Sequence, residues 1–175
     1  MAMLYRVQNA TASTTAAPVK QPTGTAVRTM LQVLHPTQPI CVVEWGISFD
    51  GSTAGTPIEV ELIHTTTVAA TMSTALVAND ITPMNYLTDA GVTGGGFTVS
   101  TAGCAFATAA VTEGSVVAPV RQGDYQLVAP TNQYIKQFPL GQGFWVPAAG
   151  VLRVRVTAAA SVNAYIYVIA GVGGD

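Results

Sequence analysis

The chain has 175 residues, of which 49% are hydrophobic and only 9% are charged, whereas about 25% of residues are charged in an average soluble domain. Disorder caused by high charge and low hydrophobicity is therefore excluded for most of the chain, and the length suffices for one domain with a buried core. The net charge of −2 argues against nucleic acid as a partner, and no apolar run approaches the roughly 20 residues that span a membrane, so we expect neither partner.

The first predicted elements are two strands, at residues 4–8 and 26–34, separated by a stretch of different composition. Residues 9–25 read NATASTTAAPVKQPTGT and are rich in Thr, Ala and Pro, with a single charge. Such a segment is too polar and too often interrupted by proline to join a core. We expect an extended arm or a surface loop, lying across a neighbouring subunit.

Two strongly alternating segments follow. One face of residues 41–49 is apolar and the other is mostly small or polar: Cys41, Val43, Trp45, Ile47 and Phe49 against Val42, Glu44, Gly46 and Ser48. Residues 58–62 alternate in the same way, with Glu59 and Glu61 on the polar face, and both patterns are typical of half-buried strands. Because a turn-forming stretch connects the two segments, we expect them to form an antiparallel pair.

Further strands are expected along the rest of the chain, which is rich in Thr, Val and Tyr: residues 65–72, 97–101, 105–111, 125–129, 133–138, 151–157 and 162–170. Residues 78–103 contain the run GGG and little apolar periodicity, so they predict a long loop. Apolar residues at helical spacing are missing. The prediction is a single all-β domain over residues 1–175, an antiparallel β-sandwich of jelly-roll-like type with roughly 8–10 strands.

The last two predicted strands carry unusual outward faces. In VLRVRVT the alternation places Leu152, Val154 and Val156 in the core, and Arg153 and Arg155 on the outside. We expect the arginines to meet acidic groups, and we favour Glu59 and Glu61, which offer a matching cross-strand ladder. An acidic patch on a partner surface, or a solvated strand face, is the alternative. In VNAYIYVIA the second face is rich in tyrosine, from Tyr165 and Tyr167. A tyrosine face suits a subunit contact because tyrosine combines a large area with a polar tip; an ordinary, partly hydrated strand face is the alternative.

A cluster of aromatic residues stands in NQYIKQFPLGQGFW: Tyr134, Phe138, Phe144 and Trp145. Aromatic rings beside Gln and Asn could form a stacking platform for sugars. Core and interface packing is the other interpretation, and it is the one that we favour.

The sequence offers no motif for catalysis, a cofactor or a metal. His35 and His64 stand beside no pattern of further ligands, whereas zinc needs three or four. The stretch GSTAG at 51–55 has Thr where a nucleophile elbow has Ser, and a strand follows it. Cys41 and Cys104 lie in apolar stretches far apart, which favours free thiols. We therefore expect no enzyme and no cofactor.

Four stretches together resemble small structural proteins of tailed bacteriophages, of the kind that decorate or cement the capsid: TMLQVLHPTQPICVVEWGISFDG, TPIEVELIHTTTVAAT, YQLVAPTNQYIKQFPLG and VLRVRVTAAASVNAYIYV. They cover about half of the chain. The resemblance implies a β-sandwich that binds the outside of an icosahedral shell, commonly as a trimer at symmetry axes. It transfers no individual functional residue.

The function expected from these observations is that of a non-enzymatic structural virion protein, which binds the exterior of a phage capsid and stabilises it. The expected partners are the major capsid protein and further copies of the chain, with a homotrimer favoured. The expected location is the capsid exterior, after synthesis in the host cytoplasm. A carbohydrate- or receptor-binding module of a virion is the alternative. The candidate interface residues are Arg153, Arg155, Tyr165, Tyr167, Tyr134 and Phe138.

Overall fold

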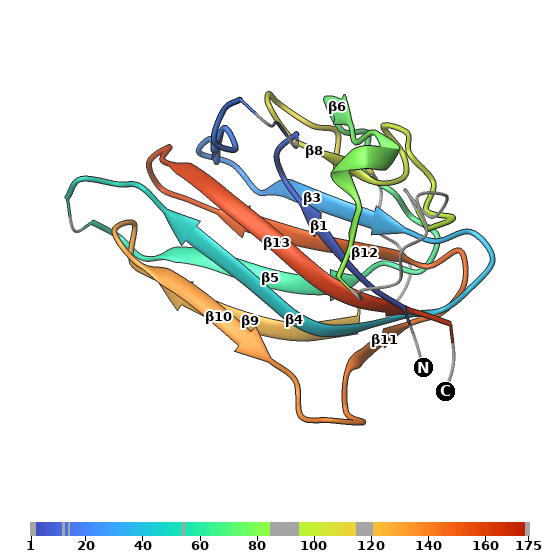
Figure 1. Ribbon diagram of the computed structural model, residues 1–175. Helices are drawn as coiled ribbons and strands as arrows, with labels where there is room; N and C mark the ends of the chain where they lie inside the picture. Colours follow the sequence, from blue (N-terminus) through green and yellow to red (C-terminus); the bar gives the residue numbers. More distant parts are fainter. Residues whose placement is uncertain are drawn as a thin grey trace.

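The structure is a computed structural model that describes residues 3–11, 13, 15–53, 55–84, 95–114 and 121–173. Two antiparallel sheets pack face to face (Figure 1), and the prediction of an all-β antiparallel sandwich is confirmed. The described residues contain thirteen strands, four of them only two residues long, and one short 3-10 turn, η1 (Ala78–Asp80).

The first sheet, called sheet A, lies in front in Figure 1. Its strands are β1 (Met3–Gln8), β2 (Gln21–Pro22), β4 (Ile40–Phe49), β7 (Thr82–Pro83), β10 (Gln133–Gln137), β11 (Phe144–Val146) and β13 (Asn163–Val172). The order is β10-β4-β13-β1-β7, and β11 also pairs with β4 while β2 pairs with β13. The two longest strands, β4 and β13, are therefore neighbours at the centre.

The second sheet, called sheet B, lies behind it. Its strands are β3 (Arg28–Leu34), β5 (Ile58–His64), β6 (Thr74–Ala75), β8 (Ala105–Phe106), β9 (Arg121–Val128) and β12 (Val151–Thr157). The order is β6-β8-β3-β12-β5-β9. The edge strand β9 of sheet B continues through a short turn into the edge strand β10 of sheet A, so the two sheets are joined at this side (Figure 1).

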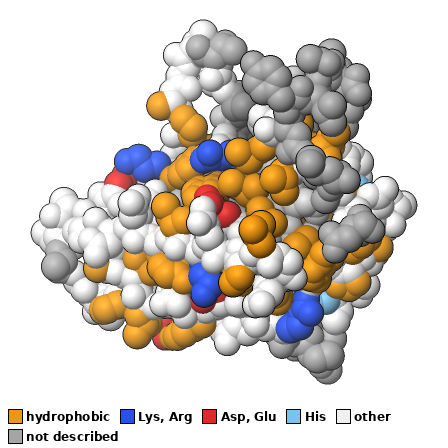
Figure 2. All heavy atoms as spheres, turned by 60° about the horizontal axis from the view of Figure 1, so that its bottom comes forward, with side chains coloured by type: hydrophobic (Ala, Val, Ile, Leu, Met, Phe, Trp, Pro, Cys, Tyr) orange, Lys and Arg blue, Asp and Glu red, His pale blue; other side chains and the backbone are white. Residues whose placement is uncertain are grey.

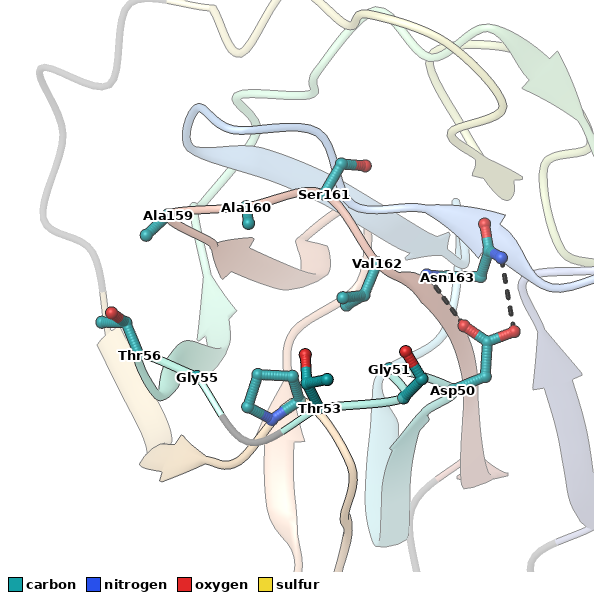
Figure 3. A pocket seen from close by; sticks show the side chains of 12 residues that line it. Asp50, Gly51, Thr53, Gly55, Thr56, Ala159, Ala160, Ser161, Val162 and Asn163 are labelled. Atoms are coloured by element: carbon teal, nitrogen blue, oxygen red, sulfur yellow. Dashed lines mark hydrogen bonds between the residues drawn. The ribbon is translucent and has the colours of Figure 1, made fainter.

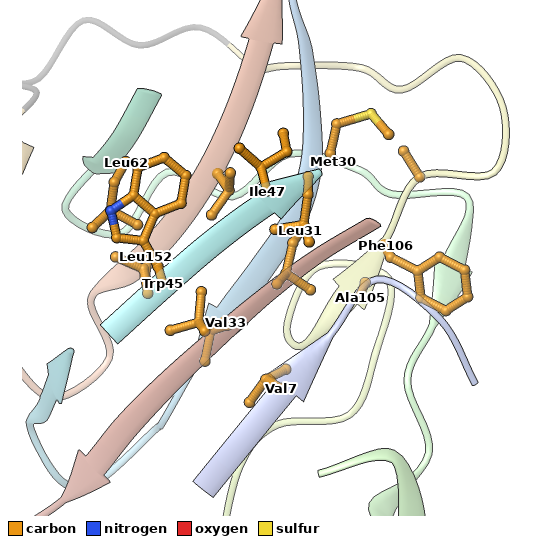
Figure 4. Close-up of a cluster of buried hydrophobic side chains, with 14 of the residues drawn as sticks. Val7, Met30, Leu31, Val33, Trp45, Ile47, Leu62, Ala105, Phe106 and Leu152 are labelled. Atoms are coloured by element: carbon orange, nitrogen blue, oxygen red, sulfur yellow. The ribbon is translucent and has the colours of Figure 1, made fainter. Parts of the chain in front are cut away.

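The core lies between the sheets, where alternate residues of each strand meet (Figure 4). Trp45 of β4 is fully buried, as are Ile166 and Val168 of β13 and Leu152 of β12. The alternation of the sequence thus predicted the inward faces of β12 and β13 correctly, because a strand places successive side chains on opposite faces.

The predicted pairing of residues 41–49 with 58–62 is wrong. Strand β4 belongs to sheet A, where it pairs with β10, β11 and β13, whereas β5 belongs to sheet B, where it pairs with β9 and β12. The connecting loop crosses from one sheet to the other. Alternation reveals which face of a strand is buried, but it does not reveal the neighbouring strand.

A β-bulge changes the predicted faces at the start of β4. The register with β13 shifts between Ile169 and Ala170, opposite Val43. As a result Val42 is fully buried and Cys41 is only partly buried, the reverse of the predicted order. A bulge inserts one extra residue and so exchanges the two faces beyond it.

Loops cover the outer side of sheet B. The predicted strands at 65–72 and 97–101 are loops, apart from an isolated bridge between Thr71 and Thr112. The buried side chain of Gln32 on β3 holds two of these loops: its amide nitrogen donates to the carbonyl oxygens of Ala70 and Gly103, and its amide oxygen accepts from the Ala70 nitrogen.

The described part of the long loop at 78–103 includes a tight glycine turn, while residues 85–94 lie outside the described residues. Gly95 and Gly96 both have positive φ angles. A Cβ atom at Gly95 would lie 2.5 Å from the Tyr5 ring, and one at Gly96 would lie 2.9 Å from the His35 ring. Glycine is required at both positions for two reasons: the backbone is left-handed, and the neighbouring rings leave no room for a side chain.

The segment at 9–25 is a surface loop whose two ends belong to the fold. The buried Asn9 side chain bonds the backbone of Ala164 and Ile166 on β13, and β2 pairs with the start of the same strand. Residues 15–20 between these anchors are exposed. The predicted position of this segment across a neighbouring subunit stays a prediction.

Candidate functional site

The outer face of sheet A carries two adjacent tyrosines. Tyr165 and Tyr167 alternate along β13 with the buried Ala164, Ile166 and Val168, so their rings lie on the side of the sheet away from the core. Both are half-buried, and their ring centroids are 6.5 Å apart. The structure thus brings together the two tyrosines that the alternation placed on one face.

Small residues on the neighbouring strand make room for these rings. Gly46 and Ser48 occupy the outer face of β4 opposite Tyr167 and Tyr165. A Cβ atom at Gly46 would lie 2.6 Å from the Tyr167 ring, which is closer than atoms can pack. The Tyr167 ring therefore lies directly over the glycine, and only glycine fits there.

The small residues leave a shallow groove between β13 and β10. Two adjoining hollows, of about 340 and about 150 Å³, share Ser48 and Tyr165. Lys20 borders one end, and the exposed Ile135 of β10 borders the other. We call this feature, with Gly46, Ser48, Ile135, Tyr165 and Tyr167, the tyrosine groove.

Hydrogen bonds fix the position of Tyr167. Its hydroxyl donates to Oε1 of Glu44 at 2.6 Å, and Gln137 donates to the other carboxylate oxygen at 2.6 Å. Burial, followed by the bond to Glu44, raises the pKa of Tyr167 to about 12. The hydrogen bond from Tyr167, followed by that from Gln137, lowers the pKa of the Glu44 carboxyl. At neutral pH the pair is therefore a protonated phenol and a carboxylate.

Arg6 of β1 fixes the second tyrosine. Its Nη2 atom donates to the Tyr165 hydroxyl at 2.9 Å, and that hydroxyl donates to Gln8 at 2.6 Å. The same guanidinium lies 4.6 Å from the centre of the Tyr167 ring, in the range of a cation–π contact. Both rings are thus held before any partner arrives, which reduces the entropy lost on binding.

The charged groups at the groove have partners within the chain: Lys20 pairs with Asp50, and Arg6 and Glu44 bond the two tyrosines. Figure 2 shows hydrophobic side chains running through the middle of the face in view, with only scattered charged groups. The charges on the groove itself are largely matched, because Glu44 accepts from Tyr167 and Arg6 lies over the same ring. Aromatic and arginine side chains with little free charge are the composition of protein interface centres.

Two predicted interface residues, Tyr134 and Phe138, lie at the edge where β9 and β10 meet. Tyr134 packs edge-on against Trp45, with ring centroids 5.6 Å apart, and its hydroxyl donates to Asp124 of β9 at 2.8 Å. The Tyr134 side chain therefore connects sheet A to sheet B at this edge. Phe138 stacks on Phe144 with centroids 6.5 Å apart.

The two remaining predicted interface residues, Arg153 and Arg155, lie on the outer face of sheet B. Arg155 forms an ion pair with Glu61 at 2.6 Å, as the predicted ladder requires. Strand β5 runs in a register that places Ile63 opposite Arg153 and Thr157 opposite Glu59. The ladder therefore has one ion pair rather than two.

Arg153 itself is fully buried, so within this chain it presents no surface to a partner. Its guanidinium bonds the Thr29 hydroxyl and the carboxylate of Glu113, which belongs to a loop that covers sheet B. Burial lowers the pKa of this guanidinium, although the Glu113 charge acts in the opposite direction. Arg153 points away from the core, as predicted, but the loop that carries Glu113 covers its side chain and shields it from solvent.

A further hollow lies at one end of the sandwich, between the loops that follow β4 and β12 (Figure 3). It measures about 480 Å³ and is lined mainly by small residues and backbone. Asp50 at its border accepts hydrogen bonds from Lys20 and from the backbone and side chain of Asn163. These bonds, that from Lys20 foremost, lower the pKa of Asp50, whose carboxylate connects the loops.

Groups that could perform other chemistry lie apart from one another. Within the described ranges, no three His, Cys, Asp or Glu side chains are grouped as metal ligands. Neither Cys41 nor Cys104 forms a disulfide; Cys104 is buried as expected, whereas Cys41 is only partly buried, and burial raises the pKa of Cys104 to about 12. No helix in the described part of the chain is long and apolar enough to cross a membrane.

Sequence reasoning missed the groove residues Gly46, Ser48 and Ile135, and also Arg6 and Glu44, whose side chains bond the two tyrosines. A signal for three of them was present, because the alternation of 41–49 places Glu44, Gly46 and Ser48 on one face. The sequence does not reveal which side chains lie beside that face. The register of β4 with β13 shows that they are those of Tyr165 and Tyr167. Comparison with known protein families, curated proteins and solved structures found no match to this chain.

Proposed function

We propose that this chain is a non-enzymatic structural protein of a bacteriophage virion, which binds the exterior of the capsid through the tyrosine groove and stabilises the shell. The groove carries the argument for binding: Tyr165 and Tyr167 are held in place on an outer sheet face with few free charges. The resemblance of four strand-rich stretches to capsid decoration proteins supports the choice of a capsid as the surface.

The proposed mechanism consists of binding to the capsid surface and involves no chemical reaction. Each copy would cover the joint between neighbouring subunits of the major capsid protein, and many copies together would oppose the internal pressure of packaged DNA.

The test is co-sedimentation with purified capsids of the encoding phage. Replacing Tyr165→Ala and Tyr167→Ala together should weaken binding by at least about tenfold, since tyrosines are frequent hot spots. The control is Tyr125→Ala, which removes an exposed tyrosine from the outer face of sheet B. Equal binding of the double variant and the wild type would refute the groove as the contact.

A carbohydrate-binding module of a virion is the second candidate. The smaller hollow supports it, because Tyr165 and Tyr167 lie there beside Gln133 and Ser48, a combination of ring faces and hydrogen-bonding groups. Titration with a panel of oligosaccharides, followed by tyrosine and tryptophan fluorescence, tests this candidate. A saturable change that the double tyrosine variant abolishes would favour it over the capsid.

A further inference from the structure

The edge strands of the two sheets differ in how they are protected from pairing with another chain. The edge strands β2, β6 and β7 are only two residues long and β11 has three, and short edge strands offer little to pair with. On β9 the Asp124 carboxylate accepts from the backbone nitrogen of Tyr125 at 3.0 Å, so a side chain of the same strand occupies that donor. Strand β10 has neither form of protection.

The free side of β10 presents the backbone groups of alternate residues. The backbone bonds from Phe49 to Asn132 and from Phe138 to Val43 show which residues of this segment point toward β4. By alternation, the N–H and C=O groups of Gln133, Ile135 and Gln137 point the other way. In the part of the chain that the structure describes, no strand lies on that side. The pairing of β10 with β4 has no bulge, and the strand contains no proline.

The side chains of β10 are arranged symmetrically about Ile135. Gln133 and Gln137 lie two residues to either side of it on the outer face, and Ile135 itself is 52% exposed. If a second β10 pairs antiparallel around Ile135, isoleucine faces isoleucine and each glutamine faces the other glutamine. Like charges directly opposite each other would oppose the pairing, and this face brings none together.

The opposite face of β10 adds charge complementarity. In the same register Lys136 of one copy lies opposite Tyr134 of the other, whose hydroxyl bonds the Asp124 carboxylate. A cation of each copy would thus face the hydroxyl–carboxylate pair of the other copy, twice by symmetry. The turn between β10 and β11 projects beyond this edge (Figure 1) and carries the fully exposed Leu140, a further apolar contact for a second copy.

We infer that β10 pairs with β10 of a second copy of this chain, forming a two-fold symmetric dimer with one continuous sheet across both sandwiches. The ladder contains the backbone groups of Gln133, Ile135 and Gln137 from both copies. The sheet order becomes β13-β4-β10-β10-β4-β13, which places the two tyrosine grooves side by side across the symmetry axis. This two-fold contact differs from the trimer that the resemblance implied, and it does not depend on the identity of the surface that the grooves bind.

Analytical ultracentrifugation of the purified chain tests the inference. We expect a species of twice the 18.0 kDa chain mass at concentrations from about 1 to about 100 µM, since a small interface gives modest affinity. Ile135→Lys should produce a monomer because two cations would then face each other. Ile135→Pro should do the same by removing a ladder donor on an edge strand, where proline is tolerated.

The matched control is Leu127→Lys, because Leu127 is a similarly exposed apolar residue on the other long edge strand, β9. This variant should remain dimeric. Thermal unfolding checks each variant, and if Ile135→Pro fails to fold, the lysine variant decides. A monomeric or trimeric wild type, or a dimer that survives Ile135→Lys, would overturn the inference, and these measurements need no capsid.

Discussion

The buried guanidinium of Arg153 forms an ion pair with Glu113, which lies forty positions earlier in the chain. The side chain of Arg153 is fully enclosed, while that of Glu113 is 23% exposed. Arg155, two residues away on the same strand face, remains partly exposed and pairs with Glu61. The two arginines of one face therefore have different energetic roles, although the sequence presents them as equivalent.

Loss of the Glu113 charge should destabilise the fold strongly. Glu113→Gln keeps the shape of the side chain but leaves the Arg153 cation buried without its counter-charge, and such a loss costs about 3 kcal/mol. Denaturant unfolding measures the free energy change. A loss below about 0.5 kcal/mol would mean that water or another polar group stabilises the Arg153 cation as effectively as Glu113 does.

The ion pair between Arg155 and Glu61 should contribute little. Both side chains are about one-fifth exposed, and exposed ion pairs contribute about 0–1 kcal/mol. Arg155→Glu alone should lower stability through repulsion by Glu61, and adding Glu61→Arg should restore it. A double-mutant cycle in denaturant measures the coupling, and a coupling near that of a buried pair would contradict the assignment.

Asn9 should be important for stability although it lies at the border of a polar loop. Its side chain accepts from the Ile166 nitrogen at 2.7 Å and donates to the Ala164 oxygen at 3.1 Å. Asn9→Ala leaves both buried backbone groups without a partner, which costs about 1–3 kcal/mol. Thr11→Ala, at an exposed position of the same loop, is the control and should not change the melting temperature. Equal melting temperatures for both variants would contradict this role.

The buried face of each strand could be predicted from the sequence, but the neighbouring strands and the loops that cover the sheets could not. The alternation around Ile166 and Leu152 identifies the buried side of each strand, because side-chain direction is a local property. The bulge at Val43 and the placement of β4 and β5 in different sheets depend on contacts with distant strands. The burial of Arg153 depends on a covering loop, which a strand pattern cannot reveal. The groove required the register of β13 against β4, so only its tyrosines were identified in advance.

Gly46→Ala should disrupt the tyrosine groove specifically. The new methyl group would collide with the Tyr167 ring and displace its hydroxyl from Glu44, at a cost of about 1–3 kcal/mol. Capsid or ligand binding through the groove should fall at the same time. Gly141→Ala is the control, because a Cβ atom there meets no neighbour within 4 Å, although its positive φ adds a small strain. Unchanged melting and binding of Gly46→Ala would show that the ring is free to move.

Alkaline pH should destabilise the protein as Tyr134 and Tyr167 ionise. Burial, followed by hydrogen bonding to carboxylates, raises the pKa of Tyr134 and of Tyr167 to about 12, against 10.0 for a free phenol. A pKa that is raised in the folded state gives stability that is complete below pH 10 and is lost as the pH rises toward 12, because the unfolded chain releases these protons first. Denaturant midpoints measured across this range should fall steadily, and the combined variant Tyr134→Phe with Tyr167→Phe should show a shallower slope. In an ultraviolet titration of the folded protein, Tyr134 and Tyr167 should ionise late; burial also raises the pKa values of Tyr5 and Tyr125. Stability that stays constant from pH 10 to 12, or an unchanged slope in the double variant, would show that the bonds to Asp124 and Glu44 do not hold the phenols protonated.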